Sequence, residues 1–203
     1  MSRITLIFAA ALLALMSGAL FYAARLPVEA TPPEAQAETQ PEPQQTELAR
    51  PSFSLPDLDG NSRSLDDWDG QHRVLNFWAT WCAPCRREIP LLKAFQEEHG
   101  PSGFQVLGIA VDFPEEVVKY AEEVDFNYPI VTGQQEAMAV AETSGIDFIG
   151  MPFTMFVTRD GDYVGAYIGE LHQSHLDEVV NILTRLDEGE ITRDAAREAF
   201  EQL

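Results

Sequence analysis

The sequence contains two cysteines, Cys82 and Cys85, separated by two residues. This spacing suits a reversible disulfide, a static disulfide or half of a zinc site. A static bridge over so short a loop would stabilise the fold little, and a tetrahedral zinc site needs four ligands. His172 and His175 form the one HxxH pair that could complete such a site, but we expect both at the surface, where the last long helix begins. The spacing therefore favours thiol–disulfide exchange.

The position of Cys82 in the chain is expected to activate its thiol. An apolar run over 74–78 predicts a buried strand, and apolar residues at helical spacing over 84–99 predict a helix that begins at the cysteines. A helix N-terminus stabilises an anion through its unpaired N–H groups and its dipole. We therefore expect a lowered pKa for the exposed Cys82 and a more buried Cys85. Arg86 and Arg87 either add positive potential or form surface ion pairs.

The rest of the chain predicts an α/β fold. Asp and Gly in the turn between 153–157 and 163–168 indicate a hairpin. Strands followed by helices, then this hairpin and a last helix, predict a mixed central sheet with helices on both faces. The other predicted strands are 105–111 and 128–131, and the other predicted helices are 114–124, 137–143 and 174–186.

The first 50 residues predict a membrane anchor and a tether. Residues 4–24 form an uncharged apolar run of 21 residues, long enough to cross a bilayer as a helix. A cleaved signal peptide is the alternative, but its cleavage candidate at 17–19 lies inside the apolar run. We predict a signal anchor over 1–26. The Pro-, Glu- and Gln-rich residues 27–50 predict an extended tether.

Composition excludes several classes of protein for the remaining residues. The chain has 13 basic and 33 acidic residues, for a net charge of -20, which disfavours binding to nucleic acid or to anionic membrane surfaces. A hydrophobic content of 45% predicts a packed core. We expect one domain over 51–186 and an extension over 187–203, in which 191–200 forms a short helix capped by Thr192.

Four segments carry a family resemblance. Residues 74–85 resemble the active-site strand and turn of the thioredoxin superfamily. Residues 85–90 (CRREIP) and 150–157 (GMPFTMFV) are similar to two signatures of the TlpA/ResA-like, DsbE/CcmG-related membrane-anchored thiol-disulfide oxidoreductases. Residues 53–60 match an FxLxDLxG start shared with these proteins and with the peroxiredoxins. The resemblance implies a thioredoxin-like fold.

The resemblance also implies roles for individual residues. Cys82 corresponds to the nucleophile and Cys85 to the resolving cysteine. Pro152 corresponds to a cis proline beside the dithiol, where the backbone of Met151 and the side chain of Trp81 would contact a substrate peptide. An ordinary turn proline is the alternative, because the cis isomer is the minority form without context.

Glu88 is the candidate for proton transfer. The resemblance places Asn76 where thioredoxin itself has a buried aspartate, and Glu88 matches the acidic residue of the TlpA/ResA-like branch. Because Glu88 lies three residues after Cys85 on a helix, the two side chains share a face. A carboxylate in apolar surroundings has a raised pKa and can exchange protons near neutral pH. A surface glutamate is the alternative.

The resemblance implies a reductase in the inner membrane with its catalytic domain in the periplasm. Its partners would be disulfide-containing envelope proteins such as apocytochrome c and a membrane dithiol electron donor, and it would need no small-molecule cofactor. Two alternatives remain open. One is a thiol peroxidase of the peroxiredoxin type, and the other is a copper-site assembly factor that uses Cys82, Cys85 and a third ligand.

Overall fold

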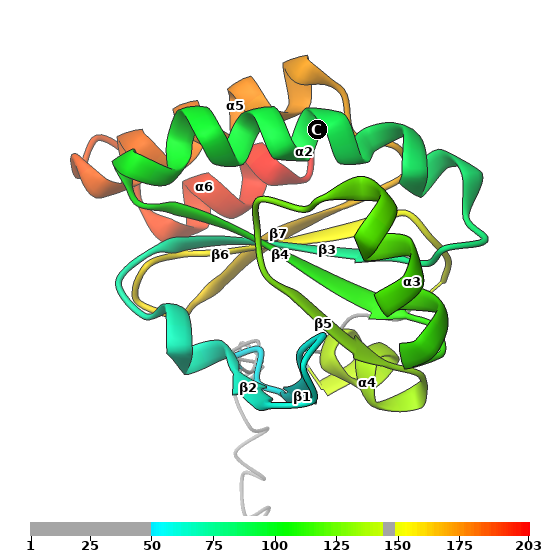
Figure 1. Cartoon of the computed structure of the whole chain (residues 1–203). Helices are drawn as coiled ribbons and strands as arrows, with labels where there is room; N and C mark the ends of the chain where they lie inside the picture. Colours follow the sequence, from blue (N-terminus) through cyan, green and yellow to red (C-terminus); the bar gives the residue numbers. More distant parts are fainter. Residues whose placement is uncertain (1–49, 144–148) are drawn as a thin grey trace, which may run out of the picture. The chain divides into compact units, whose positions relative to one another are not determined.

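The computed structural model describes residues 50–143 and 149–203 (Figure 1). The predicted signal anchor over 1–26 and all of the tether except Arg50 lie outside the described residues. Within the described part, no helix has both the length and the apolar character needed to span a membrane. The prediction of an anchor therefore stays a prediction.

A five-stranded mixed sheet forms the centre of the described part, with strand order β5-β4-β3-β6-β7. Strands β3, β4 and β5 are parallel, whereas β6 is antiparallel to both β3 and β7. All seven residues of β3 are buried, as expected for an interior strand covered on both faces. The strands are β3 (His72–Trp78), β4 (Phe104–Val111), β5 (Ile130–Gly133), β6 (Phe153–Val157) and β7 (Tyr163–Ile168).

The fifth strand begins two residues later than predicted. The prediction started at Tyr128, whereas β5 starts at Ile130. Pro129 has no N–H and cannot donate to the strand ladder, so regular pairing starts after it. Its carbonyl still accepts a hydrogen bond from the N–H of Gly108 at 3.0 Å.

Residues 54–68 form three short elements that were not predicted from the sequence. Strands β1 (Ser54–Pro56) and β2 (Ser62–Ser64) pair antiparallel, and the 3-10 helix η1 (Leu65–Trp68) follows them. Each element is too short to show a clear hydrophobic period. An isolated bridge between Asp57 and Val131 attaches this hairpin to the β5 edge of the sheet.

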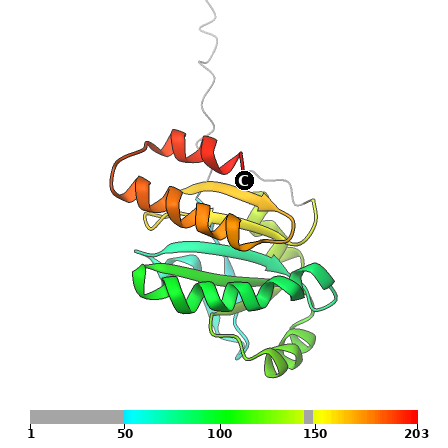
Figure 2. The same ribbon diagram turned by 90° about the horizontal axis from the view of Figure 1, so that it is seen from above.

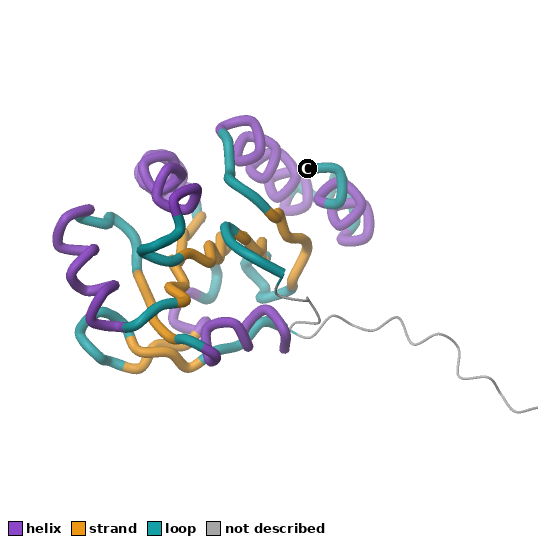
Figure 3. The backbone as a smooth tube through the Cα atoms, turned by 90° about the vertical axis from the view of Figure 1, so that its right-hand side faces the viewer, coloured by secondary structure: helices purple, strands orange, loops and turns teal. Residues whose placement is uncertain are grey.

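Helices cover both faces of the sheet, as predicted (Figure 3). Val74 and Trp78 of β3 belong to a core that includes buried residues of α2, α3, α5 and α6, whereas Leu75 and Phe77 face a second core with η1 and α4. Helices α5 and α6 lie side by side (Figure 2). The helices are α2 (Ala83–His99), α3 (Pro114–Val124), α4 (Gln135–Thr143), α5 (Gln173–Asp187) and α6 (Arg193–Phe200).

The C-terminal extension contributes to the core of the described unit. Helix α6 begins after Thr192, whose side chain caps it, as predicted. Phe200 is only 2% exposed and stacks on Phe156 with ring centroids 5.0 Å apart. Gly165 leaves the necessary room, because a Cβ at this position would lie 2.3 Å from the Cβ of Phe200. The extension therefore covers β6 and β7.

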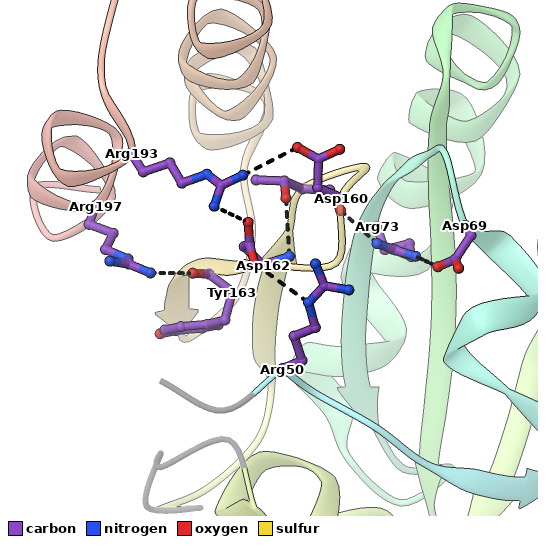
Figure 4. A network of polar contacts seen from close by, with 9 residues as sticks. Arg50, Asp69, Arg73, Asp160, Asp162, Tyr163, Arg193 and Arg197 are labelled. Atoms are coloured by element: carbon purple, nitrogen blue, oxygen red, sulfur yellow. Dashed lines mark hydrogen bonds and ion pairs between the residues drawn. The ribbon is translucent and has the colours of Figure 1, made fainter. Parts of the chain in front are cut away.

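An ion-pair cluster joins the β6–β7 turn to α6 (Figure 4). Arg193 contacts Asp162 at 2.6 Å and Asp160 at 3.3 Å, and Arg50 contacts Asp162 at 3.6 Å. The arginines are more than half exposed, so each pair is expected to contribute about 0–1 kcal/mol. The ion-pair cluster is therefore expected to contribute less to holding α6 against the sheet than the buried apolar contact of Phe200.

Candidate active site

Cys82 and Cys85 form a disulfide at the start of α2, with Cα atoms 5.3 Å apart. Cys82 is the N-cap of α2, and its Sγ accepts a hydrogen bond from the N–H of Cys85 at 3.3 Å. Pro84 is tolerated in the first turn, where its missing N–H would have no helical partner. Cys82 is 5% exposed and Cys85 is 0% exposed. The predicted order of exposure holds, but Cys82 is far more covered than we expected, because it packs within the core on the α2 face.

Asp112 fixes the turn that leads to the disulfide. Its Oδ2 accepts hydrogen bonds from the backbone N–H of Thr80 at 2.9 Å and from the Thr80 hydroxyl at 2.6 Å. Its Oδ1 accepts the N–H of Phe113 at 2.8 Å. Asp112 was not among the residues predicted from the sequence. Its position directly after β4 could have indicated a role at the site, because the carboxyl ends of the parallel strands β3 and β4 meet at one edge of the sheet.

Glu88 is buried, so the alternative of a surface glutamate is wrong. Its side chain is 1% exposed, and each carboxylate oxygen accepts a hydrogen bond. The side-chain amide of Asn76 donates to Oε1 at 2.8 Å, and the backbone N–H of Leu171 donates to Oε2 at 2.7 Å. The same Asn76 nitrogen also donates to the hydroxyl of Thr154 at 3.0 Å. Glu88, Asn76 and Thr154 thus form a buried polar cluster that joins α2 to β3 and β6.

Burial raises the pKa of Glu88 to about 7, and the negative charge of Glu170 adds to this effect. The hydrogen bonds from Leu171 and Asn76 oppose the rise without cancelling it. A carboxyl group with this pKa exists in both protonation states near neutral pH and can accept or donate a proton. Cys85 and Glu88 lie three residues apart, and both are buried residues of α2, so their side chains share one face of the helix.

The Met151–Pro152 peptide bond is cis, as the resemblance implied. Pro152 directly precedes β6, whose Phe153 pairs with Phe77 near the end of β3. The cis proline and the disulfide therefore lie at the same end of the sheet. Trp81 is 68% exposed beside Cys82, and Met151 packs, half-buried, against the core that contains both cysteines.

The remaining polar candidates are exposed or partly buried. Arg87 donates from Nε to both carboxylate oxygens of Glu170 at 3.1 Å, so the ion-pair alternative holds for this arginine. His172 is the exposed N-cap of α5, and His175 lies in the first turn of that helix. Across residues 50–143 and 149–203, no group of three or more His, Cys, Asp or Glu side chains could hold a metal ion.

The fold and the site define the class of this protein. A CxxC disulfide at the start of a helix, a cis proline at the same end of a mixed sheet and helices on both faces are the features of a thioredoxin-like protein. The model of the AhpC/TSA family matches residues 48–162. The chain therefore belongs to the AhpC/TSA family, which is thioredoxin-like.

Similar proteins indicate the class of reaction. The chain is 31% identical to a thiol-disulfide oxidoreductase named ResA from Geobacillus kaustophilus, over 63% of this chain and 71% of the relative. A thioredoxin family thiol:disulfide interchange protein from Chlorobium tepidum TLS is 30% identical with a TM-score of 0.59, over 66% and 93%. A putative thiol:disulfide interchange protein DsbE from Chlorobium tepidum is 26% identical with a TM-score of 0.58, over 68% and 94%. These relatives and the disulfide identify a thiol-disulfide oxidoreductase of the ResA/DsbE type.

Proposed function

We propose that the chain reduces disulfides of envelope proteins, with Cys82 as nucleophile, Cys85 as resolving cysteine and Glu88 as proton carrier. The observation that carries this proposal is the buried carboxyl group one helical turn beyond a disulfide at a helix N-terminus. Trp81, Met151 and Pro152 are proposed to contact the substrate peptide, because they lie at the same end of the sheet as the disulfide.

The reaction proceeds in two exchanges. The Cys82 thiolate attacks one sulfur of the target disulfide, a bond forms between Cys82 and the target, and the second target sulfur leaves and takes up a proton. Cys85 then transfers its proton to the Glu88 carboxylate and attacks Cys82. The mixed disulfide breaks, the remaining target sulfur leaves with the proton from Glu88, and Cys82 and Cys85 are joined. Two electrons pass from the dithiol to the target.

The proposed location is the inner membrane, with the catalytic domain in the periplasm. The apolar run over 4–24 and the Pro-rich stretch after it support an anchor and a tether. The oxidised Cys82–Cys85 pair would be reduced again by a membrane dithiol donor. Apocytochrome c is the proposed substrate among envelope proteins, on the strength of the family resemblance. Protease digestion of intact spheroplasts tests the location, and full protection of the domain would contradict it.

The Cys85→Ser variant tests the function. Without the resolving cysteine, Cys82 is expected to accumulate mixed disulfides with its targets in the cell envelope. Adducts would be resolved by non-reducing electrophoresis and identified by mass spectrometry. The control is the double variant Cys82→Ser/Cys85→Ser, which lacks the nucleophile. A Cys85→Ser sample with no more reductant-sensitive adducts than this control would contradict the proposal.

The family match keeps a peroxidase as the second candidate. The AhpC/TSA model covers the 53–60 segment whose pattern is shared with peroxiredoxins. A peroxidatic cysteine is expected in a different setting, without the Trp-Cys-x-Pro-Cys turn. We therefore expect the reduced protein to consume hydroperoxide no faster than the Cys82→Ser variant. A clear excess of peroxide consumption over that control would favour the peroxidase.

A further inference from the structure

The hydrogen bonds of Glu88 fit its charged form. Oε1 faces the amide N–H of Asn76, and Oε2 faces the backbone N–H of Leu171. When Glu88 takes up a proton, one oxygen becomes an O–H donor that needs an acceptor of its own. The N–H of Leu171 belongs to the backbone and cannot become an acceptor. The side-chain amide of Asn76 can, because a half-turn about its terminal bond exchanges Nδ2 for Oδ1.

Thr154 can reverse its hydrogen bond together with Asn76. The two residues are register partners on β3 and β6, and Thr154 is 0% exposed. In the present arrangement one Asn76 nitrogen donates to both Glu88 and the Thr154 hydroxyl. After the half-turn, Asn76 Oδ1 would accept from the protonated carboxyl group with one lone pair and from the rotated Thr154 hydroxyl with the other.

We propose that Asn76 and Thr154 form a reversible hydrogen-bond relay that serves Glu88 in both of its protonation states. Each proton transfer would turn the Asn76 amide and the Thr154 hydroxyl together. The relay keeps hydrogen bonds among these three buried groups in both states, and it gives the O–H of the protonated carboxyl group an acceptor that it would otherwise lack. Both are positioning residues, since they act through Glu88. The use of this relay in proton transfer during catalysis rests on the proposed function.

Other titratable groups around Glu88 do not replace this relay. Glu170, in the segment before α5, repels the Glu88 charge and is itself paired with Arg87. Tyr128, before β5, is buried, and its pKa is raised by burial and by the charge of Glu88. Cys85, on α2 itself, is held in the disulfide. Repulsion and burial raise the pKa of the carboxyl group, whereas the relay supplies the hydrogen bonds that each protonation state makes.

The Thr154→Val variant tests the relay. Without the hydroxyl, the charged state leaves one N–H of Asn76 buried and unpaired, whereas the protonated state leaves only one lone pair of Oδ1 unused, which costs less. The pKa of Glu88 is therefore expected to rise by about one unit. It is read from the 13C shift of the Glu88 carboxyl group against pH in the oxidised full-length protein, assigned by its loss in Glu88→Gln.

Two further variants make the result specific. Thr132→Val removes the hydroxyl of another buried threonine, on β5, whose Oγ1 has no hydrogen-bond partner in the described part of the chain. It should leave the pKa of Glu88 unchanged, and Thr154→Ser should restore the wild-type value. If Asn76 is a fixed donor, its N–H is unpaired in both states of Thr154→Val, and the pKa does not rise.

An unchanged or lowered pKa in Thr154→Val, or no recovery in Thr154→Ser, would overturn the relay. This titration uses no substrate and no reductant. Its failure would therefore leave the trapping of mixed disulfides by Cys85→Ser unaffected. Equally, failure of that trapping experiment would leave the measured pKa shift in place.

Discussion

Glu88 is a carboxyl group whose charged form is disfavoured by its surroundings, and this gives a testable dependence of stability on pH. Its pKa rises from 4.5 to about 7 on folding, so the folded state binds more protons than the unfolded state between these values. The stability from this group is therefore present below pH 4.5 and is lost as the pH rises through 7. The loss amounts to about 3 kcal/mol at most.

Denaturant unfolding of the oxidised protein at several pH values from 4.5 to 8 measures this effect. The Glu88→Gln variant is neutral at every pH and should lack this part of the slope. Its unfolding free energy should therefore gain on that of the wild type as the pH rises. Parallel curves for the two proteins would show that Glu88 does not carry the effect.

The same variant tests proton transfer at the residue scale. A glutamine cannot accept the proton of Cys85, so disulfide reduction by Glu88→Gln near pH 7 should slow by about a hundred-fold or more. Single-turnover reduction of a small disulfide substrate, followed by the change in tryptophan fluorescence, gives the rate. Glu97→Gln is the matched control, because it removes an exposed carboxylate from the same helix. Equal rates in Glu88→Gln and the wild type would contradict the role of Glu88.

At the scale of elements, the active-site turn depends on hydrogen bonds between Thr80, which follows β3, and Asp112, which follows β4. Asp112→Ala would remove the acceptor of the Thr80 hydroxyl and of two backbone N–H groups. We expect a loss of about 1–3 kcal/mol in unfolding free energy, because the partners are left partly buried and unpaired. Urea unfolding measures this loss. Asp112→Asn retains one acceptor oxygen and should recover part of the lost stability. Wild-type stability in Asp112→Ala would show that these hydrogen bonds do not stabilise the turn.

Helix α6 provides a second test at this scale. Phe200→Ala removes a buried ring that stacks on Phe156, and the expected cost is about 3–5 kcal/mol of unfolding free energy. Glu198→Ala, at an exposed position on the same helix, should change the stability by less than about 0.5 kcal/mol. Equal stability of these two variants would mean that the extension is not part of the cooperative fold.

At the scale of the whole molecule, the net charge of -20 dominates the electrostatics. Repulsion among the carboxylates opposes the compact state, whereas the exposed ion pairs contribute little each. Salt screens both effects, and we expect the loss of repulsion to be the larger. The thermal midpoint should therefore rise as NaCl is raised from about 0.02 M to about 0.5 M. Circular dichroism measures this, and a falling midpoint would show that the ion pairs dominate.

The elements with a clear period were predictable. The bounds of α3, β6 and β7 match the prediction, and those of β3, β4, α2 and α5 differ by at most two residues. The apolar residues of 174–186 predict one helix face, but this prediction was only partly right, because its members Val180 and Leu186 are partly buried whereas Ile182, which it did not include, is fully buried. The predicted face consisted of Leu176, Val179, Val180, Leu183 and Leu186. An apolar residue at the margin of a helix face is buried only if a neighbouring element covers it. Helix α5 packs against α6, and this contact is not specified by a local sequence pattern.

The sequence by itself determined the chemistry at Cys82 and Cys85, because a CxxC pair between a buried strand and a helix is a local pattern. The helix cap at Thr192 and the Asp-Gly hairpin turn were also predictable from short local patterns. Only the tertiary structure decided that Asn76, Glu88 and Thr154 meet, that Asp112 binds Thr80, and that Phe200 enters the core. These contacts join residues that are distant in the chain, and they depend on strand register and helix packing, which no local period specifies.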